Sequence, residues 1–477
     1  MRVAGALAVA IMLTSCSGGS TQSGALLPQR FPPFGSSGSG DIAHVVVVIQ
    51  ENRSFDDFFA TFPGADGAIG GCMEGGSLQL MRRSRSRTAS SHGCPSGDSW
   101  VRLAKVDLAE RCDFGHSYHI VPVDYNHGKM DGFGLEGGSQ NCPGKVGTKV
   151  YQFVDPAQIK PYWKIAEDYV LADQMFQTQG SGSFTSHQDL IAGSTIIDQP
   201  KDTESIVDFP TGHPWGCDAT SGTRTSLVVY KNHKIYDDHG KGPFPCFTYR
   251  TMRDLLDAKS VPWKYYSPRE PHGSGAYWNG FDAIKAVREG SEWSKNINET
   301  NQFFYDVAGG TLPAVSWIVP DESNSDHPGN HSATGPSWVA TIVNAIGTSA
   351  YWKSTAIVIL WDDWGGFYDN TPPPFFDHWG GLGFRVPMMV VSPYARQAYP
   401  SKPGYISHTQ YEFGSILKFI ENVFALGSLG TTDARATSII DCFDFSRKPR
   451  RFIKIPADRS REYFLSKPPS YLPVDTE

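Results

Sequence analysis

Polar side chains that could bind a metal ion directly follow two apolar segments. Glu51 and Asn52 come after the run IAHVVVVIQ, and Asp362 and Asp363 come after the run TAIVILW. Such runs are typical of strands buried on both faces, and α/β sheets bind ligands beyond the carboxyl ends of their strands. Carboxylate and amide oxygens are ligands of hard divalent cations. Acids also commonly cap strands, but two such pairs at two strand ends favour a metal site.

A segment of small residues carries a candidate nucleophile. Residues 179–187 read QGSGSFTSH, and a turn of this composition can present the hydroxyl of Ser183 in a constrained position. A serine hydroxyl becomes an effective nucleophile when a base or a metal activates it. The segment lacks the Gly-x-Ser-x-Gly pattern of α/β-hydrolases, so that class is not supported. Taken alone, the segment is also typical of a plain Gly/Ser loop.

Four histidines could assist such chemistry: His116, His327, His272 and His408. A histidine beside a phosphate supplies positive charge to the transition state or a proton to the leaving oxygen. The alternative for each is a structural or merely exposed side chain.

Strands that alternate with helices must position these residues. The apolar patterns predict strands at 42–50, 312–319, 355–361 and 386–392, and helices at 249–259, 337–345 and 412–424. This alternation predicts an α/β fold with a largely parallel central sheet flanked by helices. The region 70–147 is rich in Gly, Ser and Cys and lacks periodicity, so we expect long loop insertions there.

The N-terminus predicts export. Arg2 precedes a short apolar run, and Leu13-Thr14-Ser15-Cys16 resembles a bacterial lipobox. We therefore expect a signal peptide over residues 1–16 ending at a lipidated Cys16, a flexible tether over 17–40, and one folded domain over 41–477. This predicts a protein that is lipid-anchored to the bacterial cell envelope or secreted. An ordinary secretory signal is the alternative.

The cysteine spacing and the net charge argue against some classes of cofactor and binding partner. The seven cysteines after Cys16 show no Cys-x-x-Cys spacing, which argues against a zinc knuckle or a redox motif. Export favours disulfides, an odd number leaves at least one thiol free, and Cys217–Cys246 is the pair we expect. The net charge of −7 argues against a nucleic-acid binder.

The segment Gln50 to Asp56 (QENRSFD) resembles the opening motif of the bacterial phospholipase C and acid phosphatase family, whose fold is that of the alkaline phosphatase superfamily. Further motifs follow in the family's order: NHGKMDGF at 126–133, TLPAVSW at 311–317, SDHPG at 325–329, WDDWGG at 361–366 and SHT at 407–409. Six motifs in one order are not expected by chance.

The resemblance implies roles for individual residues. Glu51, Asn52, Asp362 and Asp363 match the family's ligands for a divalent metal, here Ca, Mg, Mn or Zn. The family's nucleophile also contacts that metal. Its usual Gly-Pro-(Ser/Thr) lacks the proline in this chain, and alignment on His187-Gln188 favours Ser183 over Ser181.

The same resemblance implies how substrate is held. His116 and His327 match histidines that contact the phosphate. Lys129, which lies in the motif NHGKMDGF, and His272, whose surroundings match less well, are expected to bind substrate. The expected partners are therefore a phosphate-ester substrate, of which a phospholipid is one candidate, and a membrane that the protein binds through its lipid anchor.

We therefore expect metal-dependent hydrolysis of phosphate esters through a phosphoserine intermediate, of the acid phosphatase type. The chain extends only about fifty residues beyond its last predicted helix, less than a typical further domain, which favours this type over phospholipase C. Phospholipase C activity on lipid headgroups remains an alternative, and so does a non-catalytic surface-binding lipoprotein. A sulfatase is disfavoured, because no Cys/Ser-x-Pro-x-Arg segment follows either strand.

Overall fold

A computed structural model of the chain describes residues 41–75, 93–95, 97–109, 112–135, 137, 144, 146–198, 203–231, 234–268, 276–330, 332–374, 381–398, 404–468 and 470. The predicted signal peptide, Cys16 and the tether lie outside these residues, as does His272. Within the described ranges, no helix is long and apolar enough to cross a membrane.

An eight-stranded sheet forms the centre of the molecule. Its strand order is β13-β12-β14-β1-β15-β16-β6-β17. The strands span Ile297–Asn298, Trp263–Tyr266, Val315–Ile318, His44–Gln50, Thr355–Trp361, Met388–Val391, Val170–Ala172 and Tyr405–Ser407, in that order. Neighbours pair in parallel except β16, which is antiparallel to both β15 and β6. The predicted α/β fold with a largely parallel sheet is confirmed.

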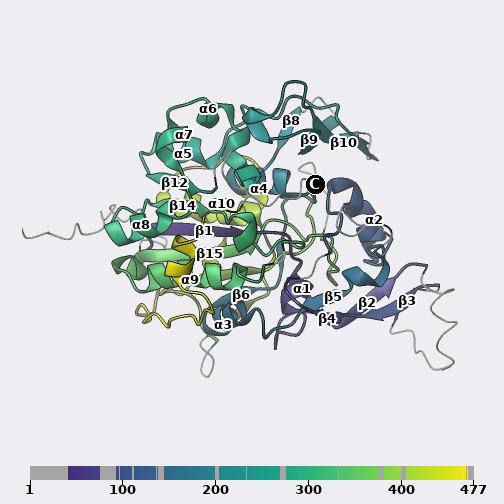
Figure 1. Cartoon of the computed structure of the whole chain (residues 1–477), viewed down its shortest axis with the longest axis horizontal. Helices are drawn as coiled ribbons and strands as arrows, with labels where there is room; N and C mark the ends of the chain where they lie inside the picture. The colour runs from purple at the N-terminus through teal and green to yellow at the C-terminus, as the bar shows by residue number, and fades with distance from the viewer. Residues whose placement is uncertain are drawn as a thin grey trace, which may run out of the picture.

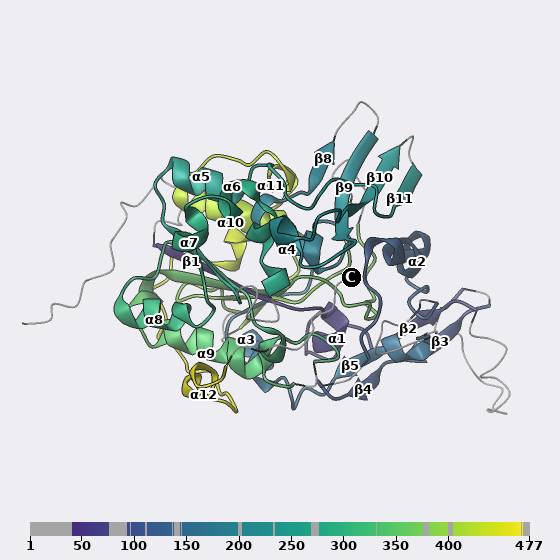
Figure 2. The same cartoon turned by 45° about the horizontal axis from the view of Figure 1, so that its top comes forward.

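Helices cover both faces of this sheet. Figures 1 and 2 show α4 (Ser183–Ala192), α5 (Met252–Ala258) and α10 (Phe413–Phe424) on one side. On the other side lie α3 (Lys160–Asp168), α8 (Gln302–Gly309) and α9 (Gly335–Gly347). Every residue of β1 and β15 is buried, as expected for strands covered on both faces. Burial on both faces explains why these strands read as continuous apolar runs.

The four predicted strands correspond to β1, β14, β15 and β16, and the three predicted helices correspond to α5, α9 and α10. Other short elements include α1 (Phe55–Phe59), α6 (Lys285–Arg288), α7 (Glu292–Asn296), α11 (Thr432–Arg435), α12 (Arg461–Leu465), β7 (Met175–Phe176) and β18 (Tyr411–Glu412).

The insertion region contains more order than its composition predicts. It includes β2 (Gly70–Met73) paired with β3 (Ser99–Arg102), β4 (Ala104–Val106) paired with β5 (Gln152–Val154), and α2 (Val121–Tyr125). A second apolar cluster joins Phe114 and Phe133 of the insertion to Trp364 and Phe367, which follow β15. The insertion is therefore packed against the end of a central strand, and the Cys72–Cys94 disulfide closes part of it.

A four-stranded antiparallel sheet, which the sequence did not predict, lies between α4 and α5 in the chain. It consists of β8 (Ile196–Asp198), β9 (Thr203–Pro210), β10 (Thr225–Lys231) and β11 (Lys234–Asp238), in the order β11-β10-β9-β8. Thr185 of α4 donates a hydrogen bond to the carbonyl of Val207 in β9 (2.7 Å), so this sheet supports the first turn of α4.

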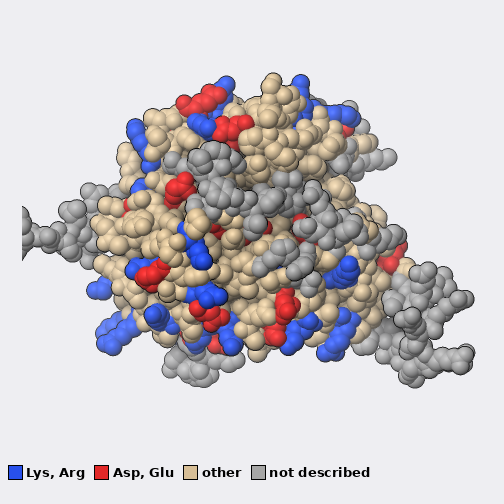
Figure 3. Space-filling view, viewed as in Figure 1, with Lys and Arg blue, Asp and Glu red and all other residues tan. Residues whose placement is uncertain are grey.

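The cysteine expectations are met within the described residues. Cys217 and Cys246 form a disulfide, and Cys442 is free and buried. Surface charges of both signs are interspersed on the face shown in Figure 3.

Candidate active site

The ends of two central strands bring the four predicted metal ligands together. β1 and β15 are parallel neighbours in register from His44↔Thr355 to Gln50↔Trp361, so Glu51 and Asn52 emerge beside Asp362 and Asp363. The backbone N–H of Asn52 donates to Asp362 Oδ1 (3.0 Å). Both strand ends therefore deliver their polar side chains to one point on the sheet edge.

Two glycines allow this close approach. Gly365 has φ +61°, and a Cβ at this position would lie 2.5 Å from the carbonyl oxygen of Asn52. At Gly366, with φ +70°, a Cβ would lie 2.6 Å from the carbonyl oxygen of Gly115. Only glycine adopts this backbone at such distances, so the glycine pair brings the chain after β15 against the segments that carry Asn52 and His116.

Ser183 begins helix α4 and faces both strand ends. Its Oγ lies 3.3 Å from Asp363 Oδ2 and 3.5 Å from both Glu51 Oε2 and Asn52 Oδ1. The positive end of the helix dipole is at this terminus, where it stabilises negative charge. The hydroxyl of Ser181, the alternative candidate, instead donates to Asp208 Oδ1 (2.6 Å). The structure thus brings Ser183, and not Ser181, to the predicted metal ligands.

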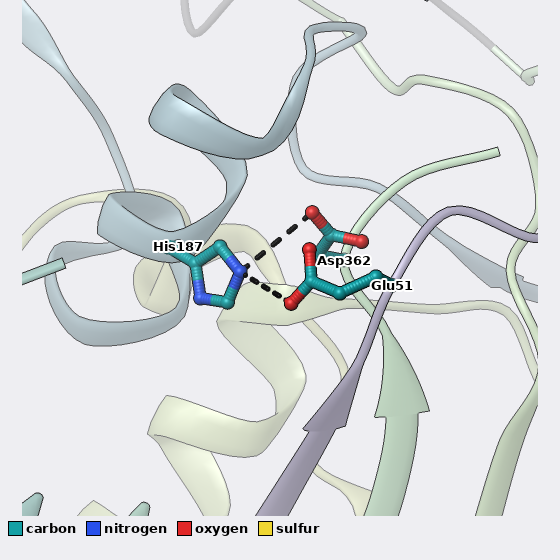
Figure 4. Close-up of side chains that lie close together, drawn as sticks. All are labelled: Glu51, His187 and Asp362. Carbon is teal, nitrogen blue, oxygen red and sulfur yellow. Dashed lines mark hydrogen bonds and ion pairs between the residues drawn. The ribbon is translucent and has the colours of Figure 1, made fainter. Parts of the chain in front are cut away.

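His187 completes a cluster that sequence reasoning did not identify. It lies one helical turn after Ser183, and its Nε2 lies 2.9 Å from Glu51 Oε1 and 3.7 Å from Asp362 Oδ2. Figure 4 shows the imidazole of α4 pointing toward the two carboxylates at the strand ends. Glu51, His187 and Asp362 could hold a metal ion between them. The i, i+4 spacing of Ser183 and His187 was the available signal, because it places both on one helix face.

Burial dominates the electrostatics of this cluster. Burial raises the pKa of Glu51 well above its ordinary value, and the neighbouring carboxylate of Asp362 raises it further. Burial and Asp362 likewise raise the pKa of Asp363, which His116 partly opposes. Burial lowers the pKa of His187 to about 4, so its imidazole is neutral near pH 7. Among the described residues, no Lys or Arg pairs with these three acids.

The residues present fit a divalent cation. Three buried carboxyl groups, the amide of Asn52 and a neutral imidazole converge, and Asp362 Oδ2 is buried without a hydrogen-bond partner in the described part of the chain. Buried charge requires compensation, and a metal ligand must be deprotonated. A divalent metal bound between them would supply the missing positive charge.

His116 orients Asn52. Its Nδ1 is 2.7 Å from the carbonyl oxygen of Phe114, which can only accept, so Nδ1 carries the proton. Its Nε2 is 2.8 Å from Asn52 Nδ2, so in the neutral ring Nε2 accepts from the amide. This arrangement leaves Asn52 Oδ1 directed toward Ser183.

His327 lies next to His116, with the two ring centroids 6.4 Å apart. Its Nδ1 is 2.7 Å from the carbonyl oxygen of Pro328, and the ring of Trp278 stacks on it at 5.8 Å. The carbonyl contact places the proton on Nδ1, so Nε2 accepts in the neutral ring and becomes a second donor in the protonated ring.

The other predicted residues are not brought to this cluster within the described residues. Lys129 is exposed, and its positive charge interacts with the carboxylate of Asp98. His408 is also largely exposed and pairs with Asp173 (2.8 Å). His272 lies outside the described residues, and the substrate-binding roles of His272 and Lys129 stay predictions.

Comparison with known proteins identifies the family. A profile of the Phosphoesterase family matches residues 42–427, which is most of the chain. The chain therefore belongs to the Phosphoesterase family. This confirms the resemblance seen in the sequence motifs.

Curated relatives carry names of one enzyme class. Phospholipase C A of Mycobacterium tuberculosis is 25% identical over 86% of this chain and 78% of that protein. Non-hemolytic phospholipase C of Pseudomonas aeruginosa is 24% identical over 81% of this chain, which spans 54% of that longer protein. Non-specific phospholipase C1 of Arabidopsis thaliana is 24% identical over 86% of this chain and 73% of that protein. The expected class, a phosphoric ester hydrolase, is confirmed at this level.

Among solved structures, a protein of the alkaline phosphatase superfamily from Vibrio parahaemolyticus aligns over 59% of this chain and 65% of its own. The sequence identity is 9% and the TM-score is 0.32.

Proposed function

We propose that the chain hydrolyses phosphate esters in two steps, with Ser183 as the nucleophile at a divalent metal site. The observation that carries this proposal is the position of Ser183 Oγ, within 3.5 Å of side-chain oxygens from Glu51, Asn52 and Asp363. A hydroxyl in this position is both a metal ligand and a nucleophile at the edge of the sheet.

The ligands that would hold the metal are Glu51, Asn52, Ser183, His187, Asp362 and Asp363. When bound, the metal lowers the pKa of the serine hydroxyl and offsets negative charge on the phosphoryl group. The carboxylate and amide oxygens alone suit Ca, Mg or Mn, whereas the imidazole of His187 favours Mn or Zn. We therefore propose a manganese or zinc enzyme.

In the first step, Ser183 Oγ forms a bond to phosphorus, and the bond between phosphorus and the leaving oxygen breaks. The hydroxyl proton passes to an adjacent acceptor, of which Asp363 Oδ2 is the nearest at 3.3 Å. In the second step, water attacks phosphorus and the bond to Ser183 Oγ breaks, which regenerates the hydroxyl and releases inorganic phosphate from a monoester or the phosphorylated headgroup from a phospholipid.

The histidines support these steps. His327 Nε2 stabilises the phosphoryl oxygens or protonates the leaving alkoxide. His116 keeps the Asn52 amide oxygen directed at Ser183 and adds its ring to the same side of the site. Loss of one such stabilising donor commonly lowers turnover by about 100- to 1000-fold.

Two substrate classes remain as candidates. Phosphate monoesters are the first, as the sequence motifs led us to expect. Phospholipid headgroup esters are the second, and the names of the relatives favour them, since each of the three described above is called a phospholipase C.

We further propose that the protein is exported and anchored through Cys16. The Cys72–Cys94 and Cys217–Cys246 disulfides support export, because disulfides persist in oxidising compartments. Replacement of Cys16 by Ala in the full chain should move the protein from the membrane fraction to the soluble fraction.

Turnover of p-nitrophenyl phosphate and p-nitrophenyl phosphorylcholine tests the catalytic proposal. We expect chelation to abolish activity, and Mn or Zn to restore it. Ser183→Ala should abolish turnover, whereas the matched control Ser181→Ala should retain most of it, because Ser181 bonds to Asp208. Near-native turnover by Ser183→Ala would contradict the mechanism. Preference for the monoester or for the choline ester decides between the two substrate classes.

A further inference from the structure

Gln50, the last residue of β1, links the metal ligands to the loop that carries His327. Its side chain is buried, and both ends of its amide are engaged. Gln50 Oε1 accepts from the backbone N–H of Asp326 (2.9 Å), and Gln50 Nε2 donates to the carbonyl of Asn324 (3.2 Å). The amide thus spans the backbone just before His327.

The backbone of the same residue joins a third segment. The carbonyl of Gln50 accepts from the N–H of Asp362 (2.9 Å), and the next residue in the chain is Glu51. One residue therefore connects the end of β1, the end of β15 and the loop 324–327. Gln50 thus ties this loop to the sheet through two hydrogen bonds to the loop backbone, at residues 324 and 326.

Other contacts of the loop act differently. His327 Nδ1 bonds within the loop to Pro328, and Asn330 and Ser325 also bond inside it. Arg53 Nε donates to the carbonyl of Asp326, and Tyr162 and Trp361 bond to its carboxylate. These contacts shape the loop and fix Asp326, whereas Gln50 binds the loop backbone at both 324 and 326 from the end of β1.

We propose that Gln50 is a positioning residue that sets where His327 stands relative to Ser183 and the metal ligands. This inference rests on the proposed role of His327 in hydrolysis. Loss of both hydrogen bonds would let the loop shift on the strand end, and a displacement of about 1 Å in a catalytic group can lower turnover by about 100-fold. Its amide bonds to the loop backbone, so the side chain acts through the position of the loop.

A double-mutant cycle with Gln50→Met and His327→Ala tests the proposal. Methionine keeps the length and buried volume of glutamine but forms neither hydrogen bond. We expect Gln50→Met alone to lower kcat for p-nitrophenyl phosphate by about 10- to 100-fold, with a much smaller change in KM. In the His327→Ala background it should lower kcat by less than about threefold, because residues that act through one another are not additive.

Manganese and zinc affinity, measured by titration calorimetry, separates this role from an effect on the metal ligands. We expect affinity within about threefold of the parent chain, since Glu51 and Asp362 keep their places. The matched control is Gln152→Met, a buried glutamine of β5 outside the site, which should leave kcat unchanged.

Equal losses from Gln50→Met in both backgrounds, or a loss of metal affinity as large as the loss of kcat, would overturn the proposal. If His327→Ala alone turned over normally, the proposal would fall with the role of His327, while Ser183→Ala would still test the hydrolytic mechanism independently. If Gln50→Met did not fold, Gln50→Asn, whose amide is too short to reach both partners, enters the same cycle with the same expectations.

Discussion

Two groups of buried carboxylates in this protein differ in what neutralises them. In the first, Arg385 Nε lies 2.8 Å from Asp369 Oδ1, and its Nη2 lies 3.7 Å from Asp56 Oδ1. In the second, Glu51 and Asp362 face His187, which is uncharged near pH 7 because burial lowers its pKa to about 4. Both groups are fully buried.

The contrast separates a structural cluster from a binding cluster. Arg385 also donates to the carbonyls of Asp66 and Asp173, so its charge is paired and its hydrogen bonds are satisfied. The strand-end acids have no such cation among the described residues, and an unpaired buried charge is costly. In the Arg385 cluster the chain thus supplies the positive counter-charge itself. At the strand ends, a bound ligand would have to supply that charge.

The largest difference should appear when one carboxylate is removed from each cluster. Glu51→Gln should lower turnover of p-nitrophenyl phosphate by at least about 100-fold, because it removes a metal ligand and its charge. Asp369→Asn should leave turnover per folded molecule near that of the parent, since Asp369 pairs with Arg385 and is not one of the proposed metal ligands. Turnover together with metal content by mass spectrometry checks both. Full metal content and turnover in Glu51→Gln would show that the strand-end acids are not a metal site.

Removal of the internal cation should have the next largest effect. Arg385→Met leaves Asp56 and Asp369 buried without compensation, which should lower the free energy of unfolding by about 3–5 kcal/mol. Arg288→Met is the matched control, because Arg288 pairs with Asp218 (2.7 Å) while partly exposed, and should cost about 1 kcal/mol or less. Denaturant unfolding measures both. If both variants lost a similar free energy of unfolding, the buried Arg385 cluster would be no more dependent on its cation than the partly exposed Arg288 pair.

Part of this arrangement was predictable from the sequence. Glu51, Asn52, Asp362 and Asp363 were identified because each pair follows an apolar run, and parallel neighbours end at one edge of a sheet. The helix α10 was also recognised from its periodicity, and the strands β1 and β15 from their continuous apolar runs. These sequence patterns are local, and the parallel pairing of β1 and β15 then brings the residues together at one edge of the sheet.

The rest depends on pairings between distant residues. Arg385 and Asp56 form an ion pair although more than three hundred residues separate them in the sequence. No local pattern around either residue predicts this pairing. The sheet β8–β11 was missed because its strands mix polar with apolar residues, so they do not read as continuous apolar runs. His187 was visible only as an alignment anchor, since its role depends on how α4 packs on the two strand ends. The close approach of Gly365 to the backbone of Asn52 likewise depends on how the segments after β1 and β15 meet.

Metal binding should stabilise one cluster and not the other. At a Mn or Zn concentration of about 100 times the Kd, the folded state gains about 2.7 kcal/mol. We expect this gain in the parent chain and in Asp369→Asn, and little of it in Glu51→Gln. Thermal unfolding with and without metal measures the gain. The same increase in all three proteins would indicate binding elsewhere on the chain.

The smallest expected effect is on the pH dependence of the metal-free protein. The pKa of Glu51 is raised well above its ordinary 4.5 in the folded state, so the folded chain retains a proton that the unfolded chain releases. Its contribution to stability is therefore fully present below pH 4.5 and declines as the pH rises through the folded pKa. Glu51→Gln cannot titrate, and its stability should fall less steeply from pH 5 to pH 8. Parallel curves in unfolding experiments with chelator would show that Glu51 ionises freely, and the contrast with the Arg385 cluster would no longer hold.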